Sequence, residues 1–245
     1  MMTFHTICTK VLLTSIIKTT SVFTCDELPI RYDPEGWNIQ LVDPSNISLI
    51  EMKVKKDKFD TYETSESGEA VISIKKLDEA LSYMPDENMV DMKVDEEKAI
   101  LVCGKVRRTI RLIQDQDIRV KQMPNLTQTC VVNINTAEMN RIASKTNSSK
   151  LFSSDAIMFK CDATGFHMRI DAEDKTDSVQ YDDEEITSPD KEEYTATYDL
   201  EYVTSALAAL PQNIKLSMGT NYPIKIETSA PFEITYVLAP RIEEE

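Results

Sequence analysis

The sequence predicts an α+β protein built from two tandem copies of a mostly antiparallel sheet domain, each with two short helices. Three observations lead to this fold class. A strand-turn-strand motif occurs twice, an amphipathic helix that ends at proline occurs twice, and both pairs have nearly the same spacing in the 245-residue chain. We therefore expect an N-terminal domain at 1–113, a connector at 114–128 and a C-terminal domain at 129–245.

The repeated hairpin reads IRYDPEGWNIQL from Ile30 and FKCDATGFHMRI from Phe159. At a constant offset of 129, Gly36 aligns with Gly165, and the same aspartate stands three residues before each glycine. Glycine supplies the positive φ that a tight turn needs, and the residues after it alternate between apolar and polar. Each segment is predicted to be a hairpin.

The repeated helix reads IKKLDEALSYMP at Ile74–Pro85 and LEYVTSALAALP at Leu200–Pro211. Apolar residues recur at spacings of three and four, which is typical of an amphipathic helix, and proline ends each one. A weaker pair aligns Leu12–Ser21 with Met139–Ser148 and predicts one more helix in each half. Each half is therefore expected to run helix, hairpin, strands, helix, strands.

The N-terminal segment, residues 1–25, predicts an amphipathic helix with Val11, Leu12 and Ile16 on one side, extending toward Val22. Its apolar run is short and interrupted, so it does not match a signal peptide, and no segment has the ~18 apolar residues of a membrane span. We expect a protein that is not secreted and has no membrane partner.

Two segments are polar and lack sustained periodicity. Gln114–Gln128 is interpreted as the connector, with Ile118, Val120 and Met123 as isolated apolar residues. Asp171–Glu193 is strongly acidic and is interpreted as a solvated loop or an edge hairpin.

Composition excludes several classes of function. The net charge of −15 excludes a uniformly basic nucleic-acid-binding surface, although a local basic patch stays compatible with it. Five glycines leave no glycine-rich phosphate loop, and two histidines form no metal or catalytic motif. The five cysteines form no CxxC pair and fit reduced thiols better than a disulfide framework: Cys8, Cys25, Cys103, Cys130 and Cys161. The redox state of Cys130 and Cys161 stays open, since a contact between these two is compatible with their places at the start of the second domain and in its hairpin. The sequence predicts no enzyme, no cofactor and no metal site.

This organisation resembles the DNA sliding clamps of the proliferating cell nuclear antigen (PCNA) family of archaea and eukaryotes. Four segments carry the resemblance, which covers residues 3–245: QLVDPS at Gln40–Ser45, YPIKI at Tyr222–Ile226, CVV at Cys130–Val132 and LAPRIEE at Leu238–Glu244. The resemblance implies a homotrimeric, head-to-tail ring around duplex DNA and a processivity factor for DNA replication and repair. It further implies binding of DNA polymerase, a clamp loader, flap nuclease and ligase through short hydrophobic peptides, in the cytoplasm near the nucleoid or in the nucleus.

By the same resemblance, a partner-peptide pocket is expected at Val42, Asn46, Ile47, Ile118, Val120, Met123, Pro223, Ala239, Pro240 and Ile242. Helix residues expected to face DNA are Lys10, Lys18, Lys75, Lys76, Arg141 and Lys145. Edge strands expected to pair between subunits contain Arg107, Arg108, Ile110, Ser178, Val179 and Tyr181. Val42 is smaller than the family's usual Met. The fourth helix has no basic residue and carries Glu201 where family members often have a base.

Three alternatives remain open at this point. The small number of basic residues expected to face DNA also fits one subunit of a heterotrimeric clamp, or a divergent clamp with weakened DNA engagement. An enzyme with a site between the halves would need a carboxylate pair or a metal, for which the sequence offers no spacing. A secreted two-domain binding protein would rest on the threonine-rich N-terminus alone.

Overall fold

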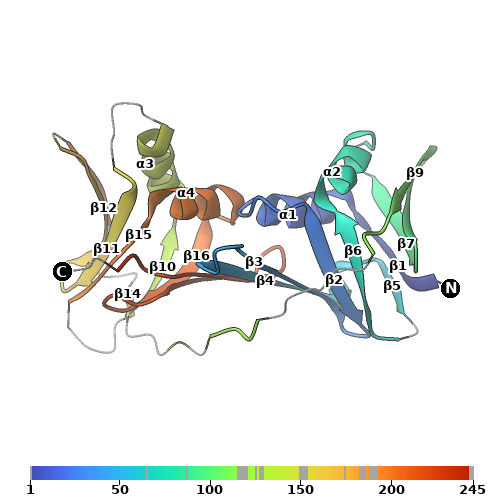
Figure 1. The fold of residues 1–245 in the computed structure, drawn as a ribbon, viewed down its shortest axis with the longest axis horizontal. Coiled ribbons are helices and arrows are strands. Elements are labelled where there is room, and N and C mark those ends of the chain that lie inside the picture. Colours follow the sequence, from blue (N-terminus) through green and yellow to red (C-terminus); the bar gives the residue numbers. More distant parts are fainter. Residues whose placement is uncertain are drawn as a thin grey trace. The chain divides into compact units, whose positions relative to one another are not determined.

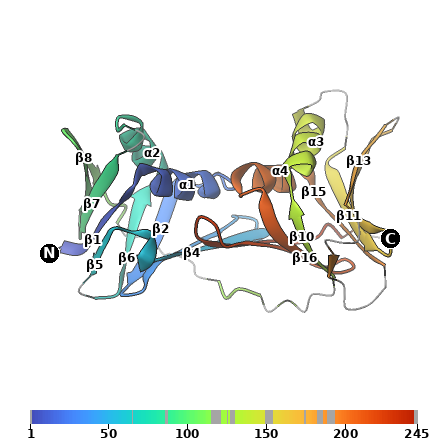
Figure 2. The ribbon, with the colours of Figure 1, turned by 180° about the vertical axis from the view of Figure 1, so that it is seen from behind.

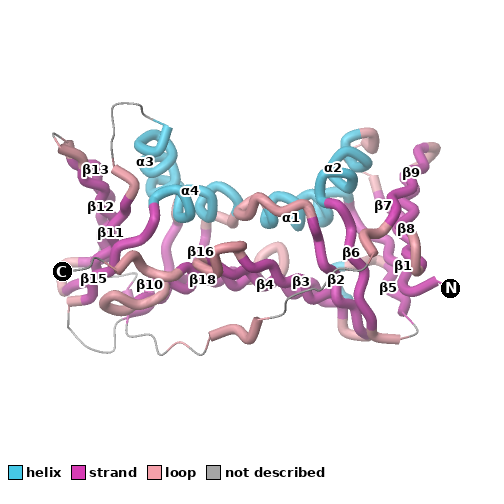
Figure 3. Tube along the Cα trace, viewed as in Figure 1, coloured by secondary structure: helices cyan, strands magenta, loops and turns pink. Residues whose placement is uncertain are grey.

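The computed structural model describes residues 2–64, 66–85, 88–114, 121–124, 126, 130–148, 154–173, 175–181, 186–187 and 193–242. The elements of the first half are β1 Met2–Thr9, α1 Lys10–Thr20, β2 Glu27–Asp33, β3 Gly36–Val42, β4 Ser48–Lys55, the 3-10 turn η1 Lys56–Lys58, β5 Thr61–Thr64, β6 Gly68–Ser73, α2 Ile74–Ser82, β7 Met89–Asp95, β8 Lys98–Cys103 and β9 Val106–Arg111. Those of the second half are β10 Cys130–Asn135, α3 Ala137–Ser148, β11 Ala156–Asp162, β12 Gly165–Asp171, β13 Thr176–Tyr181, β14 Ile186–Thr187, β15 Tyr194–Asp199, α4 Leu200–Ala209, β16 Asn213–Met218, β17 Ile224–Thr228 and β18 Glu233–Leu238. Strands dominate, as Figure 3 shows, and the expected α+β class is confirmed.

The chain forms two compact units. Unit 1 comprises Met1–Val42, Ile50–Lys121 and Ser229–Ile234, and unit 2 comprises Asp43–Leu49, Gln122–Thr228 and Thr235–Glu245. The division falls within the segment expected as the connector, of which residues 115–120, 125 and 127–129 lie outside the described part of the chain. The expected boundaries at 113 and 129 stay a prediction.

Each unit repeats the same arrangement of strands and helices. Unit 1 contains the five-stranded antiparallel sheet β5-β1-β7-β8-β9 and the paired strands β6-β2-β3. Unit 2 contains the four-stranded sheet β13-β12-β11-β15 and the paired strands β14-β10-β16-β17. Within unit 1, α1 contacts α2, and within unit 2, α3 contacts α4 (Figures 1 and 2).

Both expected hairpins are confirmed. Asp33 pairs with Gly36 at the turn between β2 and β3, and Asp162 pairs with Gly165 between β11 and β12. The two glycines have φ values of 141° and 136°, which side chains rarely adopt. A Cβ on Gly36 would also lie 2.2 Å from the carbonyl oxygen of Val54, so glycine is required there on two counts.

The N-terminal expectation is partly wrong, because a strand precedes the first helix. Residues Met2–Thr9 form β1, in which Phe4, Thr6 and Cys8 are fully buried. Thr6 hides the alternation, because a polar residue stands where the pattern needs an apolar one. A strand also precedes the helix of the second half, so each half begins with a strand.

The first helix begins at Lys10 and presents a different face to solvent from the one expected. The hydroxyl of Thr9 accepts a hydrogen bond from the backbone N–H of Leu12 at 3.3 Å and caps the helix. Leu12 and Ile16 are buried, whereas Val11 is 64% exposed. Placing Val11 on the apolar side was therefore wrong.

Aromatic side chains fill the core of unit 1. The ring of Trp37 lies 5.5 Å from Phe4 and 4.8 Å from Phe59 between ring centroids, and Phe4 lies 4.8 Å from Tyr32. The indole of Trp37 is 2% exposed. Tight aromatic contacts of this kind add to the apolar area buried by each ring.

Unit 2 combines a smaller aromatic cluster with a disulfide. Phe166 occupies the position equivalent to Trp37 and lies 5.5 Å from Phe159. Cys130 on β10 and Cys161 on β11 are both buried and form a disulfide, with Cα atoms 6.9 Å apart. The sequence left the redox state of these two residues open, because their spacing of 31 does not show that β10 and β11 face each other. Cys8, Cys25 and Cys103 are free thiols, as expected.

Candidate functional site

A short loop after β3 forms the first part of the candidate site in unit 2. The carboxylate of Asp43 accepts a hydrogen bond from the backbone N–H of Ser45 at 2.8 Å. The N–H of Asn46 donates to the carbonyl of Asp43 at 2.8 Å, and Asn46 adopts a φ of 60°. This tight turn leaves the next residue, Ile47, with 38% of its surface exposed.

The loop is tied to helix α4 by one side-chain hydrogen bond. The hydroxyl of Tyr202 donates to Oδ1 of Asp43 at 3.0 Å. Partial burial and this hydrogen bond to a carboxylate raise the pKa of Tyr202, so the phenol stays a proton donor. The contact holds the loop at a defined place over the start of α4.

The C-terminal tail lies against the loop and against the edge of β15. The N–H of Ala239 donates to the carbonyl of Ile47 at 2.9 Å, and the N–H of Arg241 donates to the carbonyl of Thr197 at 2.7 Å. Pro240, between them, has no N–H to satisfy. The tail therefore continues as an extended chain that is paired on both of its sides.

The guanidinium of Arg241 fixes the tail further. It makes a bidentate contact with the carboxylate of Asp155, with N–O distances of 2.9 Å. The hydrogen bond from the guanidinium holds the pKa of Asp155 below its ordinary value. Beyond this ion pair, the side chain of Ile242 is 83% exposed.

The expected pocket residues fall into three groups. Asn46, Ile47, Ala239, Pro240 and Ile242 lie together in unit 2, joined by the hydrogen bonds above. The residues just before Pro223 contact β15, the strand that also pairs with the tail. The N–H of Asn221 donates to the carbonyl of Thr195 at 3.0 Å, and the hydroxyl of Tyr198 donates to the carbonyl of Tyr222 at 2.8 Å.

The remaining pocket residues are not brought to the tail by any contact described. Val42 belongs to unit 1 and directly precedes the loop, and Met123 is half-buried in unit 2. Ile118 and Val120 lie outside the described residues.

Sequence reasoning missed the residues that position the site. Asp43 and Arg241 stand in the quoted motifs, but their partners Tyr202 and Asp155 carry no motif of their own. An arginine beside a proline near the C-terminus is a signal that a carboxylate partner should be sought. The identity of that partner depends on the fold.

The basic residues expected to face DNA lie on the helices, with different surroundings. In unit 1, Lys18, Lys75 and Lys76 are exposed, whereas Lys10 is half-buried and donates from Nζ to the carbonyl of Met84 at 2.7 Å. In unit 2, Lys145 is exposed and the guanidinium of Arg141 pairs with Glu138, with Nε donating at 3.0 Å.

The four helices carry little net charge compared with the chain as a whole. Together they hold six basic and four acidic side chains, a net charge of +2 in a chain whose net charge is −15. The negative charge of the protein therefore lies outside the helices.

The strands expected to pair between subunits are edge strands of their sheets in both units. In unit 1, β9 pairs only with β8 in its sheet; Arg107 is exposed, and the guanidinium of Arg108 lies 3.7 Å from the ring centroid of Tyr83. The side chain of Ile110 is 5% exposed and belongs to the core, so this residue presents only its backbone at the edge.

In unit 2, β13 pairs only with β12 in its sheet. Ser178 is exposed and Val179 is half-buried. The hydroxyl of Tyr181 donates to the carbonyl of Asn135 at 3.0 Å, which ties the end of β13 to the end of β10. The acidic segment that follows is described only in part.

Among the described residues, no group of three or more His, Cys, Asp or Glu side chains is placed to hold a metal ion. No helix in the described part of the chain is long and apolar enough to cross a membrane.

Comparisons with known proteins agree with the observed fold. Residues 10–129 match the family model described as "Proliferating cell nuclear antigen, N-terminal domain". The chain is 26% identical over 228 residues to a "DNA polymerase sliding clamp" of Natronomonas pharaonis, covering 89% of this chain and 90% of the relative. It is 27% identical over 242 residues to a protein of the same name from Methanococcoides burtonii, covering 95% and 96%.

Solved structures show the same architecture. A structure titled "C-terminal region of FEN-1 bound to A. fulgidus PCNA" has a TM-score of 0.87 at 20% identity and covers 99% of this chain and all of that one. The proliferating cell nuclear antigen of Entamoeba histolytica has a TM-score of 0.86 at 17% identity, covering 99% of this chain and 100% of that chain. At these identities the likeness concerns the fold.

Proposed function

The chain belongs to the PCNA family of sliding clamps, and we propose that it is a DNA polymerase sliding clamp. Three copies form a ring around duplex DNA, and the tail site of unit 2 tethers replication and repair proteins. The observation that carries this proposal is the tail: backbone hydrogen bonds and the Arg241–Asp155 pair hold two exposed isoleucines, Ile47 and Ile242, in a defined place.

This arrangement suits the capture of a short peptide. Exposed aliphatic side chains on a rigid support lose water when an apolar anchor of a partner covers them, and little ordering cost remains on the clamp side. Proteins that carry such an anchor, including DNA polymerase, the clamp loader, flap nuclease and ligase, would compete for this one site.

Closure of the ring would use the two edge strands. A head-to-tail contact between β9 of one copy and β13 of the next uses different surfaces on each side and closes when the rotation per subunit fits. Backbone groups on both edges are available to continue the sheets. Such a ring holds DNA by topology and needs no base recognition.

The charge distribution supports sliding. Helices with a net charge of +2 attract phosphates weakly, while the acidic remainder of the chain discourages adhesion of DNA elsewhere. We infer that the protein acts by binding and has no catalytic step of its own. Its place of work is the compartment that holds the chromosome.

The test is stimulation of a cognate DNA polymerase on a primed circular template, with a clamp loader, across a salt series. The variants Ile47→Ser and Ile242→Ser each remove about 2 kcal/mol of apolar contact with a partner and should each weaken partner binding by roughly 30-fold. The matched control is Met89→Ser in unit 1, because Met89 has the same 38% exposure as Ile47 and lies outside the tail site.

Strong stimulation that both isoleucine variants lose and the Met89 variant keeps would support the proposal. Equal loss in all three variants would contradict a tail-specific site. A parent chain that forms a trimer and stimulates no polymerase at any salt concentration would contradict the clamp function itself.

A further inference from the structure

Gln40 on β3 is bonded to the connector by both ends of its side-chain amide. Nε2 donates to the carbonyl of Lys121 at 2.8 Å, and Oε1 accepts from the N–H of the same residue at 2.8 Å. Two residues that face each other in an antiparallel sheet exchange the same pair of bonds through their backbones. The amide of Gln40 therefore takes the place of a neighbouring strand and orients the peptide groups on both sides of Lys121.

Glutamine is the side chain that this geometry requires. Its amide carries a donor and an acceptor on one planar group, whereas a glutamate carboxylate only accepts and would set an oxygen against the carbonyl of Lys121. Asparagine has the same amide on a stem that is one methylene shorter. Replacement of Gln40 by another residue is thus expected to break one bond or both.

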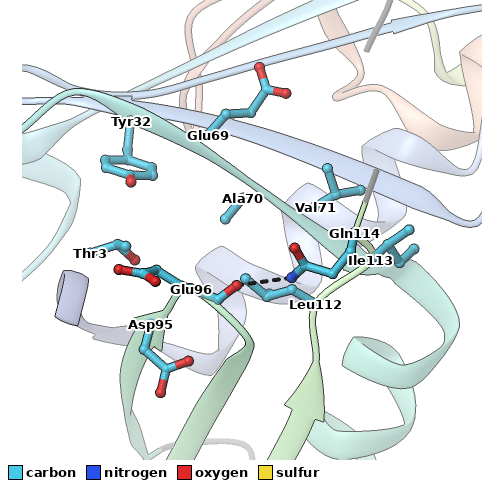
Figure 4. Close-up of a pocket in the computed structure, with 10 residues that line it drawn as sticks. All are labelled: Thr3, Tyr32, Glu69, Ala70, Val71, Asp95, Glu96, Leu112, Ile113 and Gln114. Carbon is cyan, nitrogen blue, oxygen red and sulfur yellow. Dashed lines mark hydrogen bonds between the residues drawn. The ribbon is translucent and has the colours of Figure 1, made fainter. Parts of the chain in front are cut away.

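The chain is also held where the connector begins. The N–H of Ile113 donates to the carbonyl of Val71 on β6 at 2.9 Å. Nε2 of Gln114 donates to the carbonyl of Glu96 at 2.9 Å, which is the dashed line in Figure 4. The segment from Gln114 to Lys121 therefore has both of its ends bonded to unit 1, to which it belongs.

The bonds to Gln40 bring the connector to one particular face of β3. Buried side chains alternate along this strand with half-buried ones, and Gln40 and Val42 belong to the half-buried set. Side chains two positions apart in a strand lie on the same face, so Gln40 holds Lys121 on the face that carries Val42. Val42 is expected at the partner-peptide site, and so is Met123, which follows Lys121 by two residues.

We propose that Gln40 is a positioning residue for partner binding, which holds the connector on the face of β3 that carries Val42 before a partner binds. This inference rests on the proposed function and deepens it, because it names the residue that prepares the connector. A segment that is already ordered loses less conformational entropy when a partner covers it, so the partner binds more tightly. Gln40 acts on the partner through the connector.

Hydrogen exchange and polymerase affinity of the full chain test this together. Gln40→Met keeps the length of the side chain and removes both hydrogen bonds. The protection factor of the Lys121 amide should fall about fivefold or more. The affinity for the cognate DNA polymerase should fall by about three- to tenfold, the range for a single uncharged hydrogen bond, because water compensates part of the loss. Gln40→Glu should show both effects at neutral pH, since its carboxylate cannot donate.

Asn38→Leu is the matched control. Asn38 also belongs to the half-buried set of β3, and its amide donates to Glu51 on β4 at 3.4 Å. This variant should keep the parental protection of Lys121 and the parental polymerase affinity. In all three variants the Ile113 amide should keep its protection, and the unfolding midpoint should stay close to that of the parent, because the bond at β6 does not involve Gln40.

Four results would contradict this account. Parental polymerase affinity in both Gln40 variants would overturn the inference and leave the proposed function standing, as would parental protection of Lys121 in both. Equal loss of affinity in Asn38→Leu would show an effect of the strand face in general and would overturn it as well. A parent chain that binds no polymerase would contradict the proposed function, and the inference with it.

Discussion

The two units share one plan, and the edge strands expected to pair between copies are different strands of that plan: β9 follows α2, β7 and β8 in unit 1, and β13 follows the repeated hairpin in unit 2. β9 of unit 1 reads VRRTIR and carries three arginines, whereas β13 of unit 2 reads TDSVQY and carries an aspartate and no basic residue. The hairpins, by contrast, keep the same turn and register in both units. The two edges are thus non-equivalent strands that carry different charge, and the proposed head-to-tail contact between copies requires two different surfaces of this kind.

The units also differ in what stabilises them. Unit 1 relies on a cluster of aromatic rings around Trp37, and unit 2 has fewer ring contacts and the Cys130–Cys161 disulfide. Substitutions at equivalent core positions should therefore have similar effects on stability. Removal of the disulfide, which only unit 2 has among the described residues, should affect that unit alone.

The largest effect is expected at the equivalent core positions. Trp37→Ala and Phe166→Ala each remove a ring that is at most 2% exposed, and each should lower the free energy of unfolding by about 3–5 kcal/mol. Denaturant titrations at fixed protein concentration measure both values. A loss below 1 kcal/mol in one of them would show that the two hairpins do not have equivalent roles.

Removal of the disulfide should affect unit 2 only. The closed loop spans 31 residues, and the chain-entropy relation gives a contribution of about 3.7 kcal/mol. The double variant Cys130→Ala/Cys161→Ala should show this loss, and added reductant should then change nothing further. Hydrogen exchange in β1, β7 and β8 of unit 1 should keep its parental rates. Equal acceleration in both units would contradict separate stabilisation.

Charge reversal on β9 should weaken assembly more than it affects folding. Arg107 and Arg111 are exposed, and glutamate at both positions places negative charge where the acidic second unit of the next copy is expected. The subunit dissociation constant should rise about tenfold or more, because like charges facing each other cost energy. Sedimentation equilibrium measures it, with Lys58→Glu on η1 as an exposed control. An unchanged trimer would place the contact elsewhere.

The smallest effect is a dependence of the tail on pH. The Arg241 guanidinium holds the pKa of Asp155 below the ordinary aspartate value of 3.8. A lowered folded-state pKa contributes stability above pH 3.8, and this contribution is lost as the pH falls through the folded-state value. The pair is largely exposed, so the effect is small. The protection factor of the Arg241 amide, which is corrected for intrinsic exchange at each pH, should fall on acidification in the parent and should be low at all pH values in Asp155→Asn. Identical profiles would show that the pair does not hold the tail.

The sequence predicted those features that depend on local periodicity. Hairpins at Gly36 and Gly165 and helices beginning at Ile74 and Leu200 follow from turn chemistry and from apolar spacing, and the structure confirms them. The sequence did not predict β1, because the buried Thr6 breaks the alternation of apolar and polar residues. Local patterns therefore predict helices and hairpins, but they miss an element in which tertiary packing buries a polar side chain.

Features that depend on contacts between residues far apart in the chain could not be predicted from sequence patterns. The Cys130–Cys161 disulfide needs two sheets to face each other, and the Asp43–Tyr202 contact joins residues 159 apart in sequence. The tail motif indicated where a site would lie, but the exposed positions of Ile47 and Ile242 required the fold. The cavity of unit 1 that Tyr32, Val71 and Gln114 line (Figure 4) has no sequence signal, because the residues that form it are far apart in the chain.

The central claim is that the protein holds DNA by encircling it, and release after linearisation tests this most directly. The clamp is loaded on a nicked circular DNA, free protein is removed, and the retained amount is measured at high salt before and after a single restriction cut. The account predicts stable retention on the circle and rapid loss from the cut ends. Equal retention on circular and linear DNA would contradict it, because the protein would then be held by direct contacts with DNA.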